Sequence, residues 1–172
     1  MPALLFSLPF LFSACGDTGD DTGDDTGGES SAETWVRAII DGVAYERSAA
    51  ESLLLVDWHP NRIQVFSGDN LNAVVYRWEG NGYQSWALQP IEEEKDPGLF
   101  WWPHGGVQWW SIDGVFEITR FEKNPRYGPG DHRIGWAEGT FEATLSDVLT
   151  GRNTLEVEDG AYRTVLRHGE GE

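Results

Sequence analysis

The chain has 172 residues, of which 40% are hydrophobic, so it can bury the core of one domain. Its 29 acidic and 12 basic residues give a net charge of −17, and nucleic-acid phosphates repel such a protein, which excludes nucleic acid as a partner. The single cysteine excludes an intramolecular disulfide.

The first fourteen residues, 1–14, predict a signal peptide. Their apolar run from Ala3 to Phe12 is shorter than the roughly 20 residues of a transmembrane helix and fits the apolar region of a secretory signal. The tetrapeptide Phe12-Ser13-Ala14-Cys15 resembles a bacterial lipobox, with Phe12 in place of the usual leucine. This resemblance implies a bacterial lipoprotein whose Cys15 is lipidated, and acyl chains on Cys15 would anchor the protein to a membrane surface.

Residues 15–33 predict a linker between this anchor and the domain. After Cys15 the segment repeats Asp-Thr-Gly and holds seven acidic residues and no basic one, a composition typical of a disordered, flexible tether. Calcium binding is the alternative, but the twelfth position counted from Asp17 is Gly28, where an EF-hand needs a glutamate. Gly16 follows the cysteine, whereas lipoproteins retained at the inner membrane often have Asp there. The expected location is therefore the bacterial cell envelope, at the outer rather than the inner membrane.

Residues 34–172 predict a domain of antiparallel strands, because their hydrophobic pattern has a period of two. The segment GTFEATLSD places Phe141, Ala143 and Leu145 on one face, and AYRTVLR does the same with Tyr162 and Leu166. Asp-Gly pairs favour tight hairpin turns, so TWVRAIIDGVAYERS and NTLEVEDGAYRTVLR are both interpreted as two-residue hairpins. The expected fold is all-β: an antiparallel β-sandwich or flattened barrel built from hairpins.

The opening hairpin and the segment GTFEATLSDVLTGRNTLEVEDGAYRTVL resemble a domain type of known proteins. They are similar to uncharacterised β-sandwich domains of secreted bacterial lipoproteins, in which a G-T-F-x-A-x-L strand precedes a turn and a final hairpin. The resemblance implies a β-sandwich and no particular activity.

The four histidines show no metal-ligand spacing with one another or with the cysteine, and we expect neither a metal nor a cofactor. The sequence PHGG around His104 resembles the oxyanion loop of esterases, but the Gly-x-Ser-x-Gly motif of that family is missing. His104 is interpreted as a turn residue and is kept as a candidate ligand contact beside the tryptophans.

The stretch FWWPHGGVQWW contains the best candidates for a binding site: Trp101, Trp102, Trp109 and Trp110. With a turn at 103–106, Trp101 would oppose Gln108. Neighbouring residues on a strand face opposite ways, so each Trp pair is split between two faces in any register. We expect at least one of the four to be exposed; whether they serve as core or as a ligand platform stays open.

Three functional hypotheses follow. The favoured one is a non-catalytic binding domain anchored through Cys15, with aromatic side chains contacting a glycan or an envelope protein. The rival is a hydrolase of polysaccharide or peptidoglycan with carboxylates from Glu92, Glu93, Glu94 or Asp96. The third is a structural subunit of an envelope complex. Two carboxylates in a cleft beside the tryptophans would favour the hydrolase, and full burial of all four tryptophans the structural role.

Overall fold

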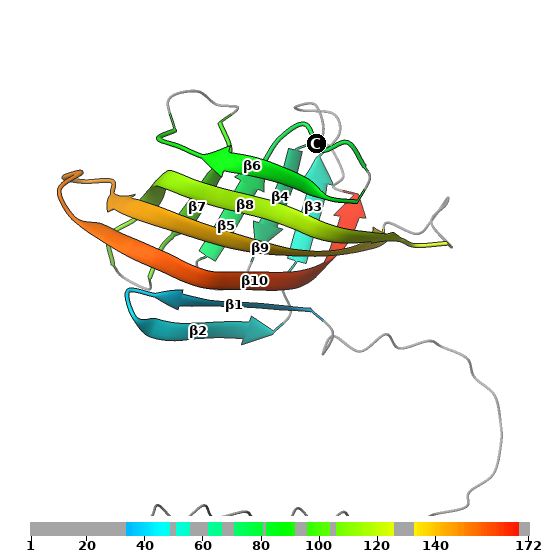
Figure 1. The fold of residues 1–172 in the computed structure, drawn as a ribbon, viewed down its shortest axis with the longest axis horizontal. Coiled ribbons are helices and arrows are strands. Elements are labelled where there is room, and N and C mark those ends of the chain that lie inside the picture. Colours follow the sequence, from blue (N-terminus) through cyan, green and yellow to red (C-terminus); the bar gives the residue numbers. More distant parts are fainter. Residues whose placement is uncertain are drawn as a thin grey trace, which may run out of the picture.

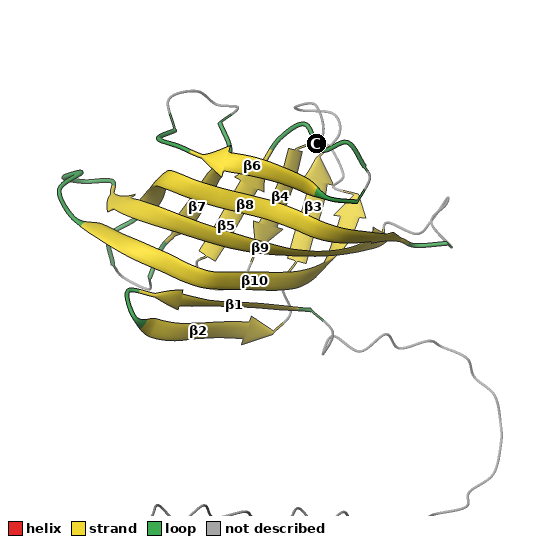
Figure 2. Cartoon of the chain, viewed as in Figure 1, coloured by secondary structure: helices red, strands yellow, loops and turns green. Residues whose placement is uncertain are grey.

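The computed structural model describes residues 34–48, 51–55, 62–66, 71–80, 82–91, 96–103, 106–125 and 133–168. Every regular element in these ranges is a β-strand, as Figure 2 shows, so the all-β prediction is confirmed. The predicted signal peptide, Cys15 and the linker 15–33 lie outside the described residues.

Ten strands make up this part of the chain, and the last three are much longer than the others. Their bounds are β1 Trp35–Ile40, β2 Val43–Ser48, β3 Glu51–Leu55, β4 Arg62–Phe66, β5 Leu71–Val75, β6 Gln84–Leu88, β7 Gly98–Trp101, β8 Trp109–Lys123, β9 Arg133–Asp147 and β10 Thr154–His168. They belong to a single hydrogen-bonded sheet.

The sheet curls until it closes on itself. Strand β10 pairs with β3, and the pairing continues through β4, β5, β7, β8 and β9 back to β10. All of these pairs are antiparallel except β3 with β10, which is the one parallel pair among the described strands. The hairpin β1–β2 extends the sheet from β10, and β6 extends it from β8. The predicted flattened barrel is confirmed, with one parallel pair that the sequence pattern did not predict.

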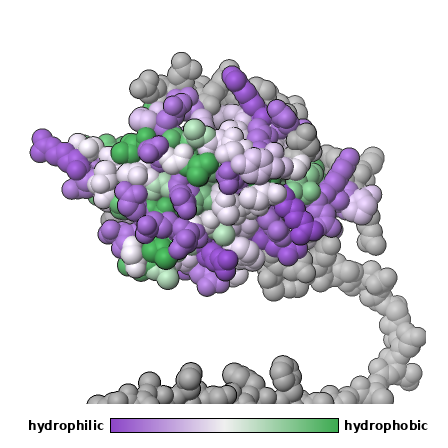
Figure 3. All heavy atoms as spheres, in the orientation of Figure 1, coloured by the Kyte–Doolittle hydropathy of each residue, from purple (hydrophilic) through white to green (hydrophobic). Residues whose placement is uncertain are grey.

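The barrel has two layers with the core between them. In Figure 1 the long strands β8, β9 and β10 cross in front of the short strands β3, β4, β5 and β7. Alternate side chains of both layers point inward, as the period of two predicts. The inward residues include Ile63, Val65, Leu71, Ala73, Val75, Leu99, Phe116, Ile118, Phe141, Ala143, Leu145, Val157, Tyr162 and Leu166. The opposite face of the long strands is largely hydrophilic, with small apolar patches (Figure 3).

Of the two predicted Asp-Gly hairpins, one is confirmed and the other is wrong. Asp41 and Gly42, with φ of 50° and 73°, form the tight turn between β1 and β2. Asp159 also has a positive φ of 51°, but β10 runs straight through it, and its register with β9 shifts between Val157 and Gly160. The pair there forms a β-bulge, because positive φ is a requirement that bulges and hairpin turns share.

Glycines let aromatic rings lie across neighbouring strands in the core. Gly139 is directly opposite Tyr162, and Gly160 is directly opposite Phe141. A Cβ on Gly139 would collide with the Tyr162 ring and the Glu117 carbonyl, and one on Gly160 would collide with the Phe141 ring. The Tyr162 hydroxyl donates a 3.0 Å hydrogen bond to that Glu117 carbonyl oxygen, so the buried phenol is satisfied.

Candidate functional site

Strands β7 and β8 bring the tryptophans together through a short contact. Only two residue pairs join the strands: Trp101 opposite Trp109, and Phe100 opposite Trp110. The predicted pairing of Trp101 with Gln108 is therefore wrong by one residue. The expected turn at 103–106 is confirmed, because the Gly106 N–H donates to the Pro103 carbonyl at 2.8 Å. The register differs because the loop that contains this turn spans seven residues, 102–108.

Two hydrogen bonds fix this seam between β7 and β8. The Leu99 N–H donates to the buried Ser111 hydroxyl at 3.1 Å, which holds β7 against β8 one step beyond the paired residues. The Val148 N–H donates to the Gln108 carbonyl at 2.9 Å. This bond ties the loop 102–108, called the aromatic loop below, to the turn between β9 and β10. The seam is short, but its ends are anchored to the long strands.

The turn between β9 and β10, residues 147–153, is held in shape by the carboxylate of Asp147. Asp147 is 4% exposed and accepts hydrogen bonds from the backbone and side chains of Thr150 and Asn153. These bonds, those from Thr150 above all, hold the pKa of Asp147 well below its usual range. Asp147 thus keeps the 147–153 turn in the shape that meets Gln108.

The strand alternation divides the tryptophans between two faces, as predicted. Trp101 and Trp109 are half-buried and pack against the core, and the Trp101 ring meets the Tyr45 ring edge-on at 5.1 Å. Trp102 and Trp110 are 54% and 39% exposed. The expectation that at least one of the four tryptophans is exposed is confirmed.

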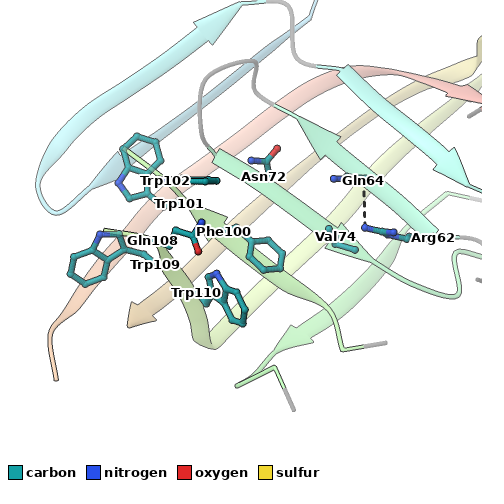
Figure 4. A pocket seen from close by; sticks show the side chains of 10 residues that line it. All are labelled: Arg62, Gln64, Asn72, Val74, Phe100, Trp101, Trp102, Gln108, Trp109 and Trp110. Carbon is teal, nitrogen blue, oxygen red and sulfur yellow. Dashed lines mark hydrogen bonds between the residues drawn. The ribbon is translucent and has the colours of Figure 1, made fainter. Parts of the chain in front are cut away.

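Residues of β4, β5, β7 and β8 and of the loop 102–108 line an open hollow of about 350 Å³, and the half-buried Trp101 and Trp109 are among them. Asn72, Phe100 and Trp110 lie in one row across β5, β7 and β8, and the Phe100 and Trp110 rings meet edge-on at 5.7 Å. Figure 4 shows the lining, which consists of Arg62, Gln64, Asn72, Val74, Phe100, Trp101, Trp102, Gln108, Trp109 and Trp110.

Apart from the tryptophans, the polar side chains of the lining are the amides of Gln64, Asn72 and Gln108 and the guanidinium of Arg62. Arg62 and Gln64 lie at one end in Figure 4, with Trp101, Trp102 and Trp109 toward the other. Arg62, Gln64 and Asn72 were not predicted from the sequence to belong to a binding site. Their only signal was an outward position between inward Ile63, Val65, Leu71 and Ala73 on short strands, and such a position does not say which strands become neighbours.

Of the remaining predicted site residues, only Asp96 falls within the part of the chain that the structure describes. His104 and the Glu92–Glu94 run lie outside the described residues. Asp96 is described and half-buried, but it is not among the lining residues. Within the described ranges, no group of three or more His, Cys, Asp or Glu side chains is placed to hold a metal ion.

The comparisons with known proteins add no functional information. No protein-family model, curated protein or solved structure matches the chain. In the described part of the chain, no helix has the length and apolar character to cross a membrane.

Proposed function

We propose that this domain is a non-catalytic glycan-binding domain and that the hollow between β4 and β8 is its binding site. The observation that carries the proposal is the combination of solvent-exposed aromatic rings with amide side chains in one open hollow. The volume of about 350 Å³ is within the range of about 300–1,000 Å³ that small-ligand pockets have.

This combination matches the two surfaces of a sugar. A pyranose ring has an apolar face where the axial C–H groups of alternate ring carbons point the same way, and this face stacks on an aromatic ring. The rim carries hydroxyls, which exchange hydrogen bonds with the amides of Gln64, Asn72 and Gln108. Each of these three amide side chains can both donate and accept, so it can satisfy a hydroxyl in either sense.

The two other hypotheses receive less support from this geometry. Among the described residues of the lining none is acidic, whereas hydrolysis of a glycosidic bond uses a pair of carboxylates. A purely structural role is favoured by full burial of the tryptophans, but Trp102 and Trp110 are exposed. Exposed aromatic residues gathered in one place are more typical of a binding surface.

The test is binding of the full chain, in mild detergent, to an oligosaccharide array, followed by calorimetric titration of the sugar that binds best. We expect Trp102→Ala to weaken binding by about tenfold or more, as for an aromatic anchor. The matched control is Tyr83→Ala, which removes an aromatic side chain that is 65% exposed and lies outside the hollow. Binding to no oligosaccharide, or an equal loss in both variants, contradicts the proposal.

We further propose that the domain is held in the bacterial cell envelope by a lipid on Cys15, with residues 15–33 as its tether. The place where the first strand begins supports this arrangement. Strand β1 begins at the opposite end of the barrel from the 147–153 turn (Figure 1), and that turn contacts the aromatic loop. A tether entering at Thr34 would therefore leave the aromatic end pointing away from the anchor.

Labelling with palmitate in a bacterial host tests the anchor. We expect the full chain to incorporate label and to sediment with membranes, and Cys15→Ser to do neither. Equal labelling of both proteins would show that the anchor is elsewhere or absent.

A further inference from the structure

We propose that the glycan recognised by the hollow carries a carboxylate and that Arg62 is the residue that binds it. This inference rests on the proposed glycan-binding function and names the chemical class of the ligand. It follows from the one charged side chain among the described residues of the lining and from the buried Nε of this side chain, which has no hydrogen-bond partner.

The hydrogen-bonding capacity of Arg62 is almost unused. Its Nε is buried and has no hydrogen-bond partner. One Nη lies 3.5 Å from the Gln64 side-chain oxygen, at the outer limit of a hydrogen bond, and the guanidinium carbon is 6.0 Å from the centre of the Tyr76 ring. No carboxylate within the described ranges forms an ion pair with Arg62.

Among the described arginines, only Arg62 combines a buried Nε that has no hydrogen-bond partner with the absence of a carboxylate within 4.0 Å. Acidic residues outnumber basic ones by 29 to 12, so carboxylates are abundant. On the long strands, Arg120 and Arg163 each lie within 4.0 Å of the Glu138 carboxylate. Withdrawing a charge from water without pairing it costs free energy. A ligand that supplies the missing acceptor recovers that cost on binding.

The shape of the guanidinium selects the ligand group. Its planar fork presents parallel N–H donors that match the two oxygens of a carboxylate. Gln64 adds to this donor surface, because its oxygen faces Arg62 and its NH₂ group remains to donate. A neutral hydroxyl could accept from one of these donors, whereas a carboxylate accepts from two and also compensates the charge.

The charge of the whole protein limits how many carboxylates the ligand carries. A net charge of −17 repels a polyanion, and this repulsion extends over about 10 Å at moderate salt. The favoured ligand therefore has a single acidic sugar among neutral ones. A polymer with a carboxylate on every sugar gains the same contact with Arg62, but each of its remaining carboxylates is repelled by the protein.

The experiment uses matched pairs of oligosaccharides that differ at C6 of one sugar, which is either a primary alcohol or a carboxylate. Affinities of the full chain are measured by calorimetry for both members and for a homopolymer of uronic acid. The variants are Arg62→Gln and Arg62→Lys. The control is Arg120→Gln, which makes the same change in net charge at an arginine whose side chain is 65% exposed and lies outside the hollow.

We expect the carboxylated member to bind about tenfold or more tightly than its neutral partner, as for a charge-assisted hydrogen bond. Arg62→Gln lowers the affinity for the carboxylated member more than the affinity for the neutral one and so removes this preference, while Arg120→Gln changes neither affinity. Arg62→Lys keeps only part of the preference, because a point charge replaces the fork. The homopolymer binds more weakly per chain than the singly carboxylated sugar at low salt.

The possible outcomes distinguish a failure of the carboxylate inference from a failure of the glycan-binding proposal. If neither member of any pair binds, the glycan-binding proposal fails. If both members bind equally well, glycan binding stands and the carboxylate inference is wrong. If Arg62→Gln lowers both affinities equally, Arg62 shapes the hollow and does not bind the acid. Should Arg62→Gln fail to fold, the comparison of matched sugars on the unaltered protein still decides.

Discussion

Two aromatic clusters in the described part of the chain differ in what covers them. Inside the barrel, the Phe116 and Tyr162 rings stack at 5.1 Å, Phe141 lies beside them, and all three are at most 2% exposed. On the outside, Phe100 and Trp110 meet edge-on at 5.7 Å, and Trp110 is 39% exposed. Ring contacts of similar distance thus serve the core in one place and an open hollow in the other.

The difference shows that strand pairing, more than aromatic content, decides the role of a ring. The inner cluster lies on β8, β9 and β10, where long registers of antiparallel pairs bring glycines opposite Tyr162 and Phe141. The outer cluster lies where β7 and β8 share two pairs. The long registers enclose the inner rings between backbone and one another, whereas the short seam leaves Trp110 partly exposed to solvent.

The largest expected effect comes from truncating a ring of the inner cluster. Phe141→Ala leaves a cavity under Gly160 and beside Tyr162, and such a change costs about 3–5 kcal/mol of unfolding free energy. The matched outer variant, Phe100→Ala, should cost less than half as much, because Phe100 is only half-buried. Urea titrations of both variants measure the two free energies. Equal losses would mean that the outer cluster is as much a part of the core as the inner one.

Next in size are the inward tryptophans of the seam. Trp101→Ala removes the edge-on contact with Tyr45 and half-buried apolar surface, and we expect it to cost about 2–4 kcal/mol. The same urea titrations measure it. A cost below about 1 kcal/mol would show that the face of the seam toward the core contributes little to folding.

A smaller loss is expected from adding a methyl group where a ring crosses a strand. Gly139→Ala drives a Cβ into the Tyr162 ring, and overpacking of this kind costs about 1–3 kcal/mol. Gly82→Ala is the control, because nothing lies within 4 Å of its added Cβ. If thermal unfolding gives the same midpoint for both variants, the core around Tyr162 is looser than its contacts indicate.

The sequence predicted the inner cluster better than the outer one, for a physical reason. Alternation along a strand is local, so the inward face of Phe141 and Leu145 could be predicted and is confirmed by their burial. Pairing between strands is not local. The same Asp-Gly signal marked a turn at Asp41 and a bulge at Asp159, and nothing near Arg62 indicated that it would share a hollow with Trp110, 48 residues further along the chain.

The pH dependence of stability should report on the turn that supports the outer cluster. The pKa of Asp147 is lowered by its bonds from Thr150 and Asn153, so its unfolded form binds a proton first as the pH falls. The stability that these bonds contribute is therefore present above the ordinary aspartate pKa, about 3.9, and is lost below it toward the folded pKa. Unfolding midpoints measured between neutral pH and pH 2 should fall more steeply for the unaltered protein than for Asp147→Asn. Parallel curves would contradict this account of the turn.

The smallest expected effect on folding belongs to Trp102, the most exposed of the described tryptophans. Trp102 is 54% exposed and lies outside the paired residues of β7 and β8, so Trp102→Ala should change the unfolding free energy by no more than about 0.5 kcal/mol. Its indole should also be the one most accessible to acrylamide, and its removal should lower the quenchable fraction of the fluorescence. Trp109→Ala is the contrast, because that ring packs against the core and its loss should lower stability without lowering that fraction. The same residue that is nearly neutral for folding is the one whose loss should weaken glycan binding most, since a ring left uncovered by the protein is free to be covered by a ligand. A Trp102→Ala variant that loses 2 kcal/mol or more of stability would show that the outer cluster is held together for the fold itself.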